Sequence, residues 1–139
     1  MADTLHLRVA TPEHLFVDEE VSGVELPGKN GYLGVLPGHA PLLSALDPGV
    51  LTYASGGGQQ KLAIDGGFVE VFEDNVRVLA DHAERPADIR VDEARQELQN
   101  AEQALKQVHD ESESNAALLA IRKAQARIDA AQQGGSTPS

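Results

Sequence analysis

One stretch of the sequence comes close to a phosphate-binding loop. Residues Gly23–Asn30 follow the spacing G-x-x-x-x-G-K, with Gly28 and Lys29 where such a loop would hold a phosphate. The final position, however, is Asn30, which has no hydroxyl group for magnesium. Pro27 and the glycines that follow also prevent the helix that this kind of loop requires. We therefore interpret the stretch as a turn between two strands.

The remaining residues that could carry chemistry are scattered. No histidine is three or four residues from another, so their spacing does not predict a zinc site. No serine lies in a nucleophile elbow, and acidic runs such as 18–20 are most simply a solvated surface. The sequence thus predicts neither a catalytic residue nor a bound metal. The histidines in question are His6, His14, His39, His82 and His109.

Two other sets of residues are candidates for binding. His39 lies in a turn between Gly38 and Ala40, where it either bonds local backbone or contacts a partner, because loops often carry binding. Asp92 and Arg95 are three residues apart and would share one helical face, either as a surface ion pair or as part of a binding site. The spacing alone leaves these alternatives open.

Composition limits the kind of protein that can use these residues. The chain has 139 residues with 22 acidic and 11 basic side chains, a formal net charge of −11 that disfavours nucleic-acid binding. It has no cysteine, and no apolar run approaches the roughly 20 residues that span a bilayer. The N-terminus lacks the pattern of a signal peptide. We expect a protein facing the cytoplasm, with no direct membrane insertion, that reaches a membrane only through other proteins.

Glycine and proline divide the chain into two parts. Seventeen of these twenty residues lie at or before Pro86, and none lies between Ala87 and Gln133. The first part has short alternating apolar patterns separated by turn signals, typical of an antiparallel β-sandwich or barrel. The signals recur at Pro27-Gly28, Pro37-Gly38, Pro48-Gly49, Gly56–Gly58 and Gly66-Gly67.

The second part has a helical period. Two apolar stripes with steps of four and three residues predict two antiparallel helices, joined by a polar loop at 109–115 in which Ser112 or Ser114 caps the second helix. The stripes are Ala94, Leu98, Ala101, Leu105 and Val108, then Ala117, Ile121, Ala124, Ile128 and Ala131. Alternate positions are alanine, so the seam buries few large side chains, and we expect a hairpin that can exchange partners.

The two predicted helices differ in charge. Residues 88–111 carry seven acids and three bases, whereas residues 116–133 carry Arg122, Lys123 and Arg127 against one acid, Asp129. The basic residues of the second helix either complement the first helix or seek an acidic surface on a partner. We predict an α+β fold: a β-sandwich domain at 1–86, a helical hairpin at 87–133 and a flexible tail at 134–139.

Several motifs in order along the chain resemble the epsilon subunit of the F-type ATP synthase. The first is Gly31–Leu43 (GYLGVLPGHAPLL), in which LGxxPGHAPL is close to a signature of that family. Matches continue at Ile64–Val71, at Val76–Ala83 and at Asp92–Arg95, and the resemblance runs from about Leu5 to about Gln133.

This resemblance implies a non-catalytic rotor subunit of the central stalk, coupling proton translocation to ATP synthesis. Its partners would be the gamma subunit, the c-ring, and the catalytic beta (and alpha) subunits. The loop with Tyr32 and His39 would face the c-ring, although Tyr32 stands where the family often has an acidic residue. The complex would lie at the cytoplasmic face of a bacterial plasma membrane, or alternatively at a thylakoid membrane.

The resemblance also implies roles for the hairpin. In its extended state the second helix would contact the catalytic subunits through Arg122, Lys123 and Arg127 and restrain ATP hydrolysis. Some bacterial members bind regulatory ATP at this hairpin; here the matching residues would be Asp92, Arg95, Arg122 and Arg127, with Gln96 departing from the family's alanine. No other cofactor is implied. The alternative functions are an ATP-sensing protein or an adaptor with no rotary role.

Overall fold

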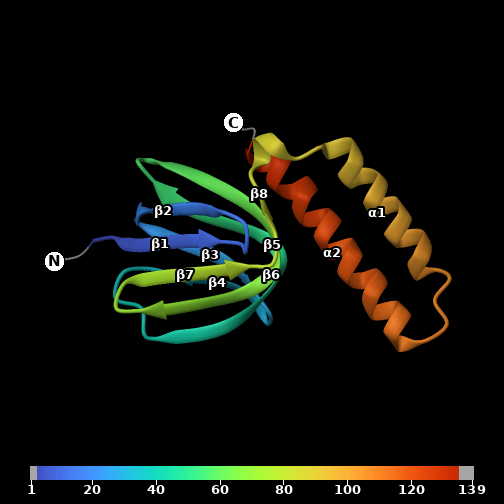
Figure 1. Cartoon of the computed structure of the whole chain (residues 1–139), viewed down its shortest axis with the longest axis horizontal. Helices are drawn as coiled ribbons and strands as arrows, with labels where there is room; N and C mark the ends of the chain where they lie inside the picture. The colour runs from blue at the N-terminus through green and yellow to red at the C-terminus, as the bar shows by residue number, and fades with distance from the viewer. Residues whose placement is uncertain (1–2, 135–139) are drawn as a thin grey trace.

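The protein folds into a β-sandwich followed by two helices, which confirms the predicted α+β class (Figure 1). The structure is a computed structural model and describes residues 3–134. The strands are β1 (Leu5–Ala10), β2 (Leu15–Val21), β3 (Gly23–Gly28), β4 (Gly31–Val35), β5 (Leu42–Ser55), β6 (Gly58–Phe72), β7 (Asn75–Ala80) and β8 (Ala83–Glu84). A short 3-10 turn, η1 (Pro86–Asp88), leads into helices α1 (Val91–Leu105) and α2 (Glu111–Gly134).

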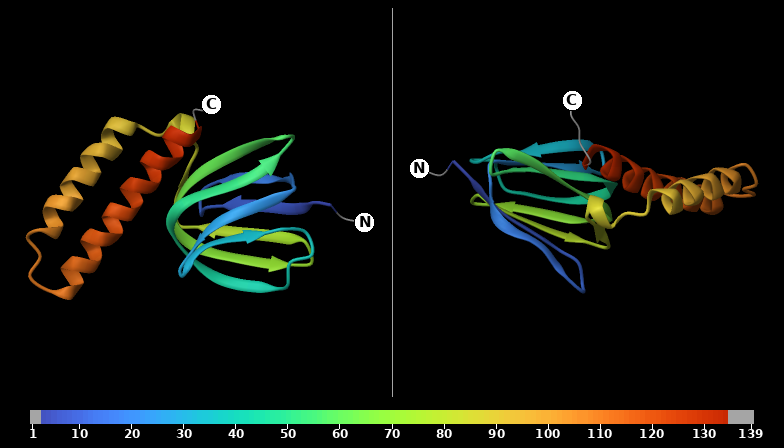
Figure 2. Two further views of the ribbon diagram at one scale, coloured as in Figure 1. Left: turned by 180° about the vertical axis from the view of Figure 1, so that it is seen from behind. Right: turned by 90° about the horizontal axis from the view of Figure 1, so that it is seen from above.

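The strands form one continuous sheet that curls over to make both layers of the sandwich (Figures 1 and 2). The strand order is β2-β1-β7-β6-β5-β3-β4, with β8 paired to β6. Among the described strands the pairing is antiparallel except for β1 with β7, which run parallel. Alternate residues from both layers meet in an apolar core that includes Leu7, Leu26, Leu51 and Val69, all fully buried.

Strands β5 and β6 are longer than the sequence pattern indicates. Two of the predicted turns, Pro48-Gly49 and Gly66-Gly67, lie inside these strands, where the sheet bends from one layer to the other. Gly67 has φ of +131°, and a Cβ there would lie 2.1 Å from the Leu79 carbonyl oxygen. Glycine is therefore required for the bend rather than for a chain reversal.

The helices form the predicted antiparallel hairpin, with Ala94, Ala101, Ala117 and Ala124 buried along its seam. The predicted loop boundary is wrong, because α2 begins at Glu111 and Ser112 and Ser114 lie within its first turn. The cap is supplied by Asp110, whose Oδ1 accepts a hydrogen bond of 2.8 Å from the Glu113 amide. The predicted tail at 134–139 lies outside the described residues, apart from Gly134.

The hairpin rests on the sandwich through α2, and α1 packs on the far side of α2 (Figures 1 and 2). The contact is a second, small apolar cluster, separate from the main core, to which α2 contributes Ala130 and Ala131. The sandwich contributes Val50 and Ala63, the linking segment contributes Ile89, and the first residue of α1 contributes Val91. Only the C-terminal half of α2 takes part, so the loop end of the hairpin projects away from the sandwich.

We predict that residues 1–86 fold without the hairpin. Every residue of the main core lies between Leu5 and Ala83, whereas removing the hairpin uncovers only the small cluster around Val50 and Ala63. Calorimetry of a chain truncated after Pro86 should show one cooperative thermal transition. A fragment that melts without a cooperative transition would place the hairpin within the core and move the predicted domain boundary.

Candidate functional site

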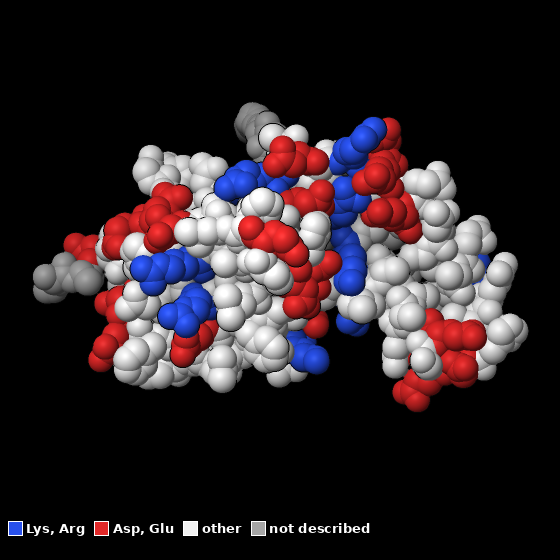
Figure 3. Space-filling model, viewed as in Figure 1, with Lys and Arg blue, Asp and Glu red and all other residues white. Residues whose placement is uncertain are grey.

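The junction between hairpin and sandwich is organised around one arginine of α2. The Arg127 Nε and Nη2 donate hydrogen bonds of 2.7 and 3.2 Å to the two carboxylate oxygens of Glu84 in β8. Nη2 also donates to Glu93 at 3.0 Å and Nη1 to Glu97 at 2.8 Å, both on α1. We call these four residues the Arg127 cluster. Figure 3 shows positive side chains gathered along this junction between acidic ones.

Burial makes this cluster stronger than an ordinary surface ion pair. The Arg127 and Glu84 side chains are 17% and 19% exposed, so water screens their charges only partly. Burial by itself lowers the pKa of Arg127, but the hydrogen bonds to Glu84, Glu93 and Glu97 outweigh it and raise the pKa overall. The guanidinium therefore stays charged at any pH at which the protein is folded.

Lys123, one turn before Arg127, also faces the sandwich. Its Nζ lies 3.9 Å from Oδ2 of Asp65 in β6. The other oxygen of Asp65 is buried and has no hydrogen-bond partner, and burial raises the pKa of this carboxyl group. The Lys123 contact is thus long and only partly compensates the buried charge, so it contributes less to the junction than the Arg127 cluster does.

Arg122 of α2 and Tyr32 of β4 meet on the side of α2 away from Lys123 and Arg127. Both line a shallow hollow with Pro48 and Gly49, and the Tyr32 hydroxyl accepts a hydrogen bond of 3.0 Å from the Val50 amide. A Cβ on Gly49 would lie 2.8 Å from this hydroxyl, so glycine is needed for the approach of the tyrosine. Tyr32 as a whole remains 55% exposed.

His39 lies at the opposite end of the sandwich from Tyr32. The amide of the neighbouring Gly38 donates a 2.7 Å hydrogen bond to Asp74 in the β6–β7 turn, the end farthest from the helices (Figure 1). The His39 Nδ1 lies 2.7 Å from the Ala40 carbonyl oxygen, which confirms the local backbone bond considered from the sequence. The structure therefore separates Tyr32 and His39, although the sequence groups them in one loop.

The four residues considered for ATP are likewise not brought together. Asp92 accepts a 3.0 Å hydrogen bond from the Glu93 amide, and among the described ion pairs none joins it to Arg95. Arg122 and Arg127 line different hollows, on opposite sides of the docked part of α2. ATP binding by these residues stays a prediction, and in this conformation Arg127 already holds three carboxylates.

A second feature, absent from the sequence predictions, is the outward-facing side of β5, β6, β7 and β1, which we call the outer face. Four large apolar side chains are more than half exposed there: Leu43, Phe68, Phe72 and Leu79. Phe68 pairs directly with Leu79 across β6 and β7. Their exposure on one sheet face indicates a surface that another protein covers. The alternation of exposed Phe68 and Phe72 with buried Val69 and Val71 was the available sequence signal.

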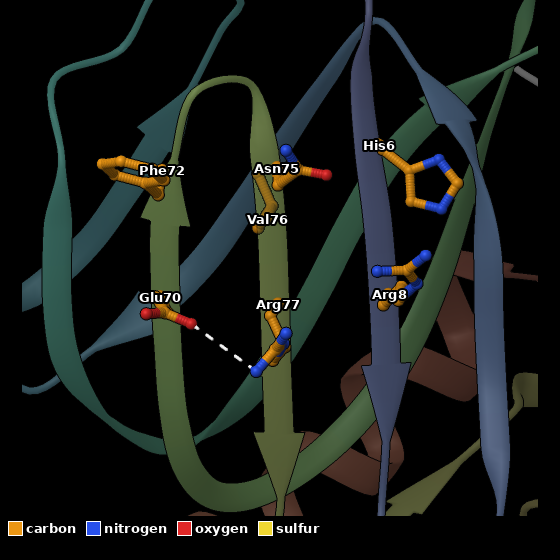
Figure 4. Close-up of a pocket in the computed structure, with 7 residues that line it drawn as sticks. All are labelled: His6, Arg8, Glu70, Phe72, Asn75, Val76 and Arg77. Atoms are coloured by element: carbon orange, nitrogen blue, oxygen red, sulfur yellow. Dashed lines mark ion pairs between the residues drawn. The ribbon is translucent and has the colours of Figure 1, made fainter.

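Charged residues cross the outer face in one row. Glu70, Arg77 and Arg8 occupy directly paired positions on β6, β7 and β1 (Figure 4), and Asp18 pairs with Arg8 from β2. Arg77 lies 3.8 Å from Glu70, and Arg8 lies 3.4 Å from Asp18, while the two arginines are neighbours in the parallel register. Arginine beside exposed phenylalanine and leucine is the composition expected of a protein interface.

His6, at the edge of this row, joins β1 to the edge strand β2. Its Nδ1 lies 2.7 Å from Glu20 and its Nε2 lies 2.5 Å from Asp18. Both ring nitrogens face carboxylate oxygens, and this arrangement favours the doubly protonated imidazolium, in which both nitrogens donate. Hydrogen bonds to Glu20 and then Asp18 raise the pKa of His6; His6 in turn lowers the pKa of Asp18, and Thr4 and His6 lower that of Glu20.

We predict a pH-dependent stability that His6 causes. Because folding raises the His6 pKa, this residue stabilises the fold fully below its unfolded pKa of about 6.5, and the contribution disappears as pH rises through the folded value. The free energy of unfolding should therefore fall with rising pH above about 6.5, measured by urea denaturation at several pH values. His6→Gln should flatten that slope; an unchanged slope would assign it to other groups.

The described residues show neither a metal site nor a helix that crosses a membrane. No group of three or more histidines and carboxylates within 3–134 is arranged to hold a metal ion. No described helix is long and apolar enough to span a bilayer.

Comparison with known proteins shows what this chain is similar to. Residues 4–86 match the family "ATP synthase, Delta/Epsilon chain, beta-sandwich domain". The chain is 46% identical over 133 residues to the ATP synthase epsilon chain of Solibacter usitatus, covering 96% of this chain and 99% of the relative. It is 42% identical to the epsilon chain of Nitratidesulfovibrio vulgaris, covering 92% and 96%. Its fold matches a chain of the Euglena gracilis mitochondrial ATP synthase (OSCP/F1/c-ring) with a TM-score of 0.80 at 23% identity, over 94% of this chain and 82% of that one.

Proposed function

Because this chain belongs to the ATP synthase delta/epsilon chain family, as a relative of its epsilon chains, we propose that it is a rotor subunit of the central stalk that couples proton translocation to ATP synthesis. The family assignment makes it a non-catalytic subunit of that complex. The observation that carries the proposal is the agreement in both parts of the chain, since the 46% identity extends through the sandwich and the hairpin.

The outer face is the proposed site for the gamma subunit. A subunit that turns with the stalk must be held firmly, and the outer face offers a cluster of four exposed large apolar side chains for such a contact: Leu43, Phe68, Phe72 and Leu79. Arg8 and Arg77 would set the register of the contact by pairing with acidic groups on gamma.

The c-ring is proposed to meet one end of the sandwich. Tyr32 and His39 remain the predicted contacts, and because they lie at opposite ends they are alternatives rather than one surface. Either placement would put the complex against a membrane through the ring, at the cytoplasmic face of a bacterial plasma membrane or at a thylakoid membrane.

The hairpin is the proposed regulator. In the docked form described here, Arg127 and Lys123 face acidic groups of this chain. After undocking, these residues and Arg122 would be free to contact acidic surfaces of the catalytic beta and alpha subunits and restrain hydrolysis. The geometry supports this because the apolar contact that holds α2 on the sandwich is small.

Co-purification tests the proposal. An affinity-tagged chain expressed in its own host should retain ATP synthase alpha, beta and gamma chains after membrane extraction, and its deletion should abolish ATP-driven proton pumping by membrane vesicles. An adaptor or ATP-sensing protein without a rotary role would be recovered without those chains. Vesicles that pump normally without it would contradict the coupling role.

A further inference from the structure

The Arg127 cluster joins three separate elements at one guanidinium. Four of the five N–H donors of Arg127 are used: two on Glu84 of β8, one on Glu93 and one on Glu97 of α1. Within residues 3–134 no other side chain forms ion pairs with both the sandwich and α1. The cluster therefore fixes the position of both helices relative to the sandwich.

The apolar contact beside the cluster is too small to fix that position well. It consists of Val50, Ala63, Ile89 and Ala130, with Val91 and Ala131 partly buried against them. Half of these side chains are alanine, which buries little apolar area. The two-oxygen contact with Glu84 is, in contrast, short, directional and largely shielded from water.

We propose that the Arg127 cluster holds the hairpin docked without any bound nucleotide, and that breaking it is the step that releases the hairpin. The proposal deepens the regulatory role given above and rests on it for its consequence in the assembled complex. In this proposal Glu84, Glu93 and Glu97 take part in regulation, whereas the sequence analysis predicted such a role only for basic residues.

The net charge of the Arg127 cluster explains why docking of the hairpin needs no bound nucleotide. Three carboxylates against one guanidinium leave the cluster with a net charge of −2, which repels the phosphates of a nucleotide. A triphosphate could use more than one N–H donor of Arg127 only by displacing a carboxylate, because a single donor remains unused. In the docked form the carboxylates of the chain thus take the place that an anionic ligand would fill.

The test is a distance measurement on the isolated full-length chain. The chain has no cysteine, so spin labels can be attached at Gln59→Cys in β6 and Ser112→Cys at the loop end of the hairpin, both exposed. Double electron–electron resonance of the otherwise wild-type protein without nucleotide should give one distance distribution, that of the docked hairpin. Adding Mg-ATP should leave it unchanged.

Glu84→Gln and Arg127→Gln should each lower the ratio of docked to undocked hairpin at least about tenfold. Glu84→Gln removes the carboxylate through which Arg127 binds the sandwich, and Arg127→Gln leaves three carboxylates without their counter-ion. Arg127→Lys should fall between them and the wild type, since it keeps the charge and loses the two-oxygen contact. Glu97→Gln removes only a contact between α1 and α2, because Glu97 is half-exposed on α1 and pairs with Arg127 without touching the sandwich. Glu102→Gln, an exposed α1 residue outside the cluster, is the matched control and should be unchanged.

Two results would overturn the proposal: wild-type distances in both Glu84→Gln and Arg127→Gln, or a wild-type hairpin that docks only after Mg-ATP is added. The rate of ATP hydrolysis by the assembled complex distinguishes a failure of the cluster proposal from a failure of the proposed regulatory role. A Glu84→Gln chain that undocks but leaves hydrolysis unchanged supports the cluster and contradicts the regulatory role. A changed hydrolysis rate with an unchanged distance distribution contradicts the cluster and leaves the regulatory role in place.

Discussion

Leu79→Asp should prevent the chain from remaining in the assembled ATP synthase. Leu79 is 56% exposed on the outer face and pairs with Phe68, so a carboxylate there would be buried against gamma without a partner. Central apolar residues of an interface typically contribute about 2–4 kcal/mol, which corresponds to a loss of affinity of roughly 30-fold or more. Recovery of gamma with a tagged chain, quantified from washed membranes, measures this directly.

The effect should be confined to the interface. Since Leu79 is exposed, its replacement should change the free energy of unfolding of the isolated chain by no more than about 1 kcal/mol. Leu118→Asp, a similar change at a partly exposed leucine of α2, is the control and should co-purify normally. If the Leu79→Asp chain is retained as well as the control, the outer face does not dock on gamma and a different surface holds the chain in the complex.

The sequence predicted the class of fold because its two parts use different periods. Glycines and prolines end at Pro86 and helical stripes begin soon after, so the order of sandwich and hairpin could be inferred. The path of the sheet could not. Pro48-Gly49 and Gly66-Gly67 have the local composition of turns. In the structure they only bend β5 and β6, because these two strands stay paired with each other on both sides of each bend.

The candidate site was less accessible to sequence reasoning. The stripe prediction found the alanines that face α1, but Ala126 and Ala130 are also buried, because a second face of α2 rests on the sandwich. The alternating apolar patterns of the first part also mislead at Leu62–Ile64, where all three residues are buried because Ala130 of α2 covers Ala63 on the outward side. Contacts between elements distant in sequence, such as Arg127 with Glu84, depend on this docking and leave no periodic trace.

The sequence left two roles open for the basic residues of α2: pairing with acidic groups of the chain itself, or contact with an acidic surface on a partner. The structure is compatible with both. Arg127 and Lys123 pair with acidic groups of the chain itself, as charge complementarity predicted. The same side chains would become available to an acidic partner only after the hairpin leaves the sandwich. A partner can then shift the population by binding the released form better.

Replacing Arg122, Lys123 and Arg127 together with alanine should raise ATP hydrolysis by the reconstituted complex. The change undocks the hairpin by removing the Arg127 cluster, but it also removes every cationic side chain that α2 could offer to the catalytic subunits. A released hairpin without these charges cannot hold an acidic surface. We expect hydrolysis to rise by roughly fivefold or more, the usual scale of a regulatory coupling, while synthesis is largely preserved.

Variants with opposite expectations make this result specific. Ala101→Leu with Ala124→Leu should overfill the helix seam and favour the released form with all three cations intact, and hydrolysis should fall. A chain truncated after Pro86 has neither docking nor cations and should hydrolyse ATP as fast as the triple variant. The wild-type inhibition should also weaken between low and high salt, because exposed charges carry it. The measurement is ATPase turnover of four complexes, which carry the wild-type chain, the triple variant, the double leucine variant or the truncated chain.

Equal rates in wild type, triple variant and truncation would show that the hairpin of this chain does not restrain hydrolysis. The acidic groups around Arg127 would then serve only to fix the hairpin in place.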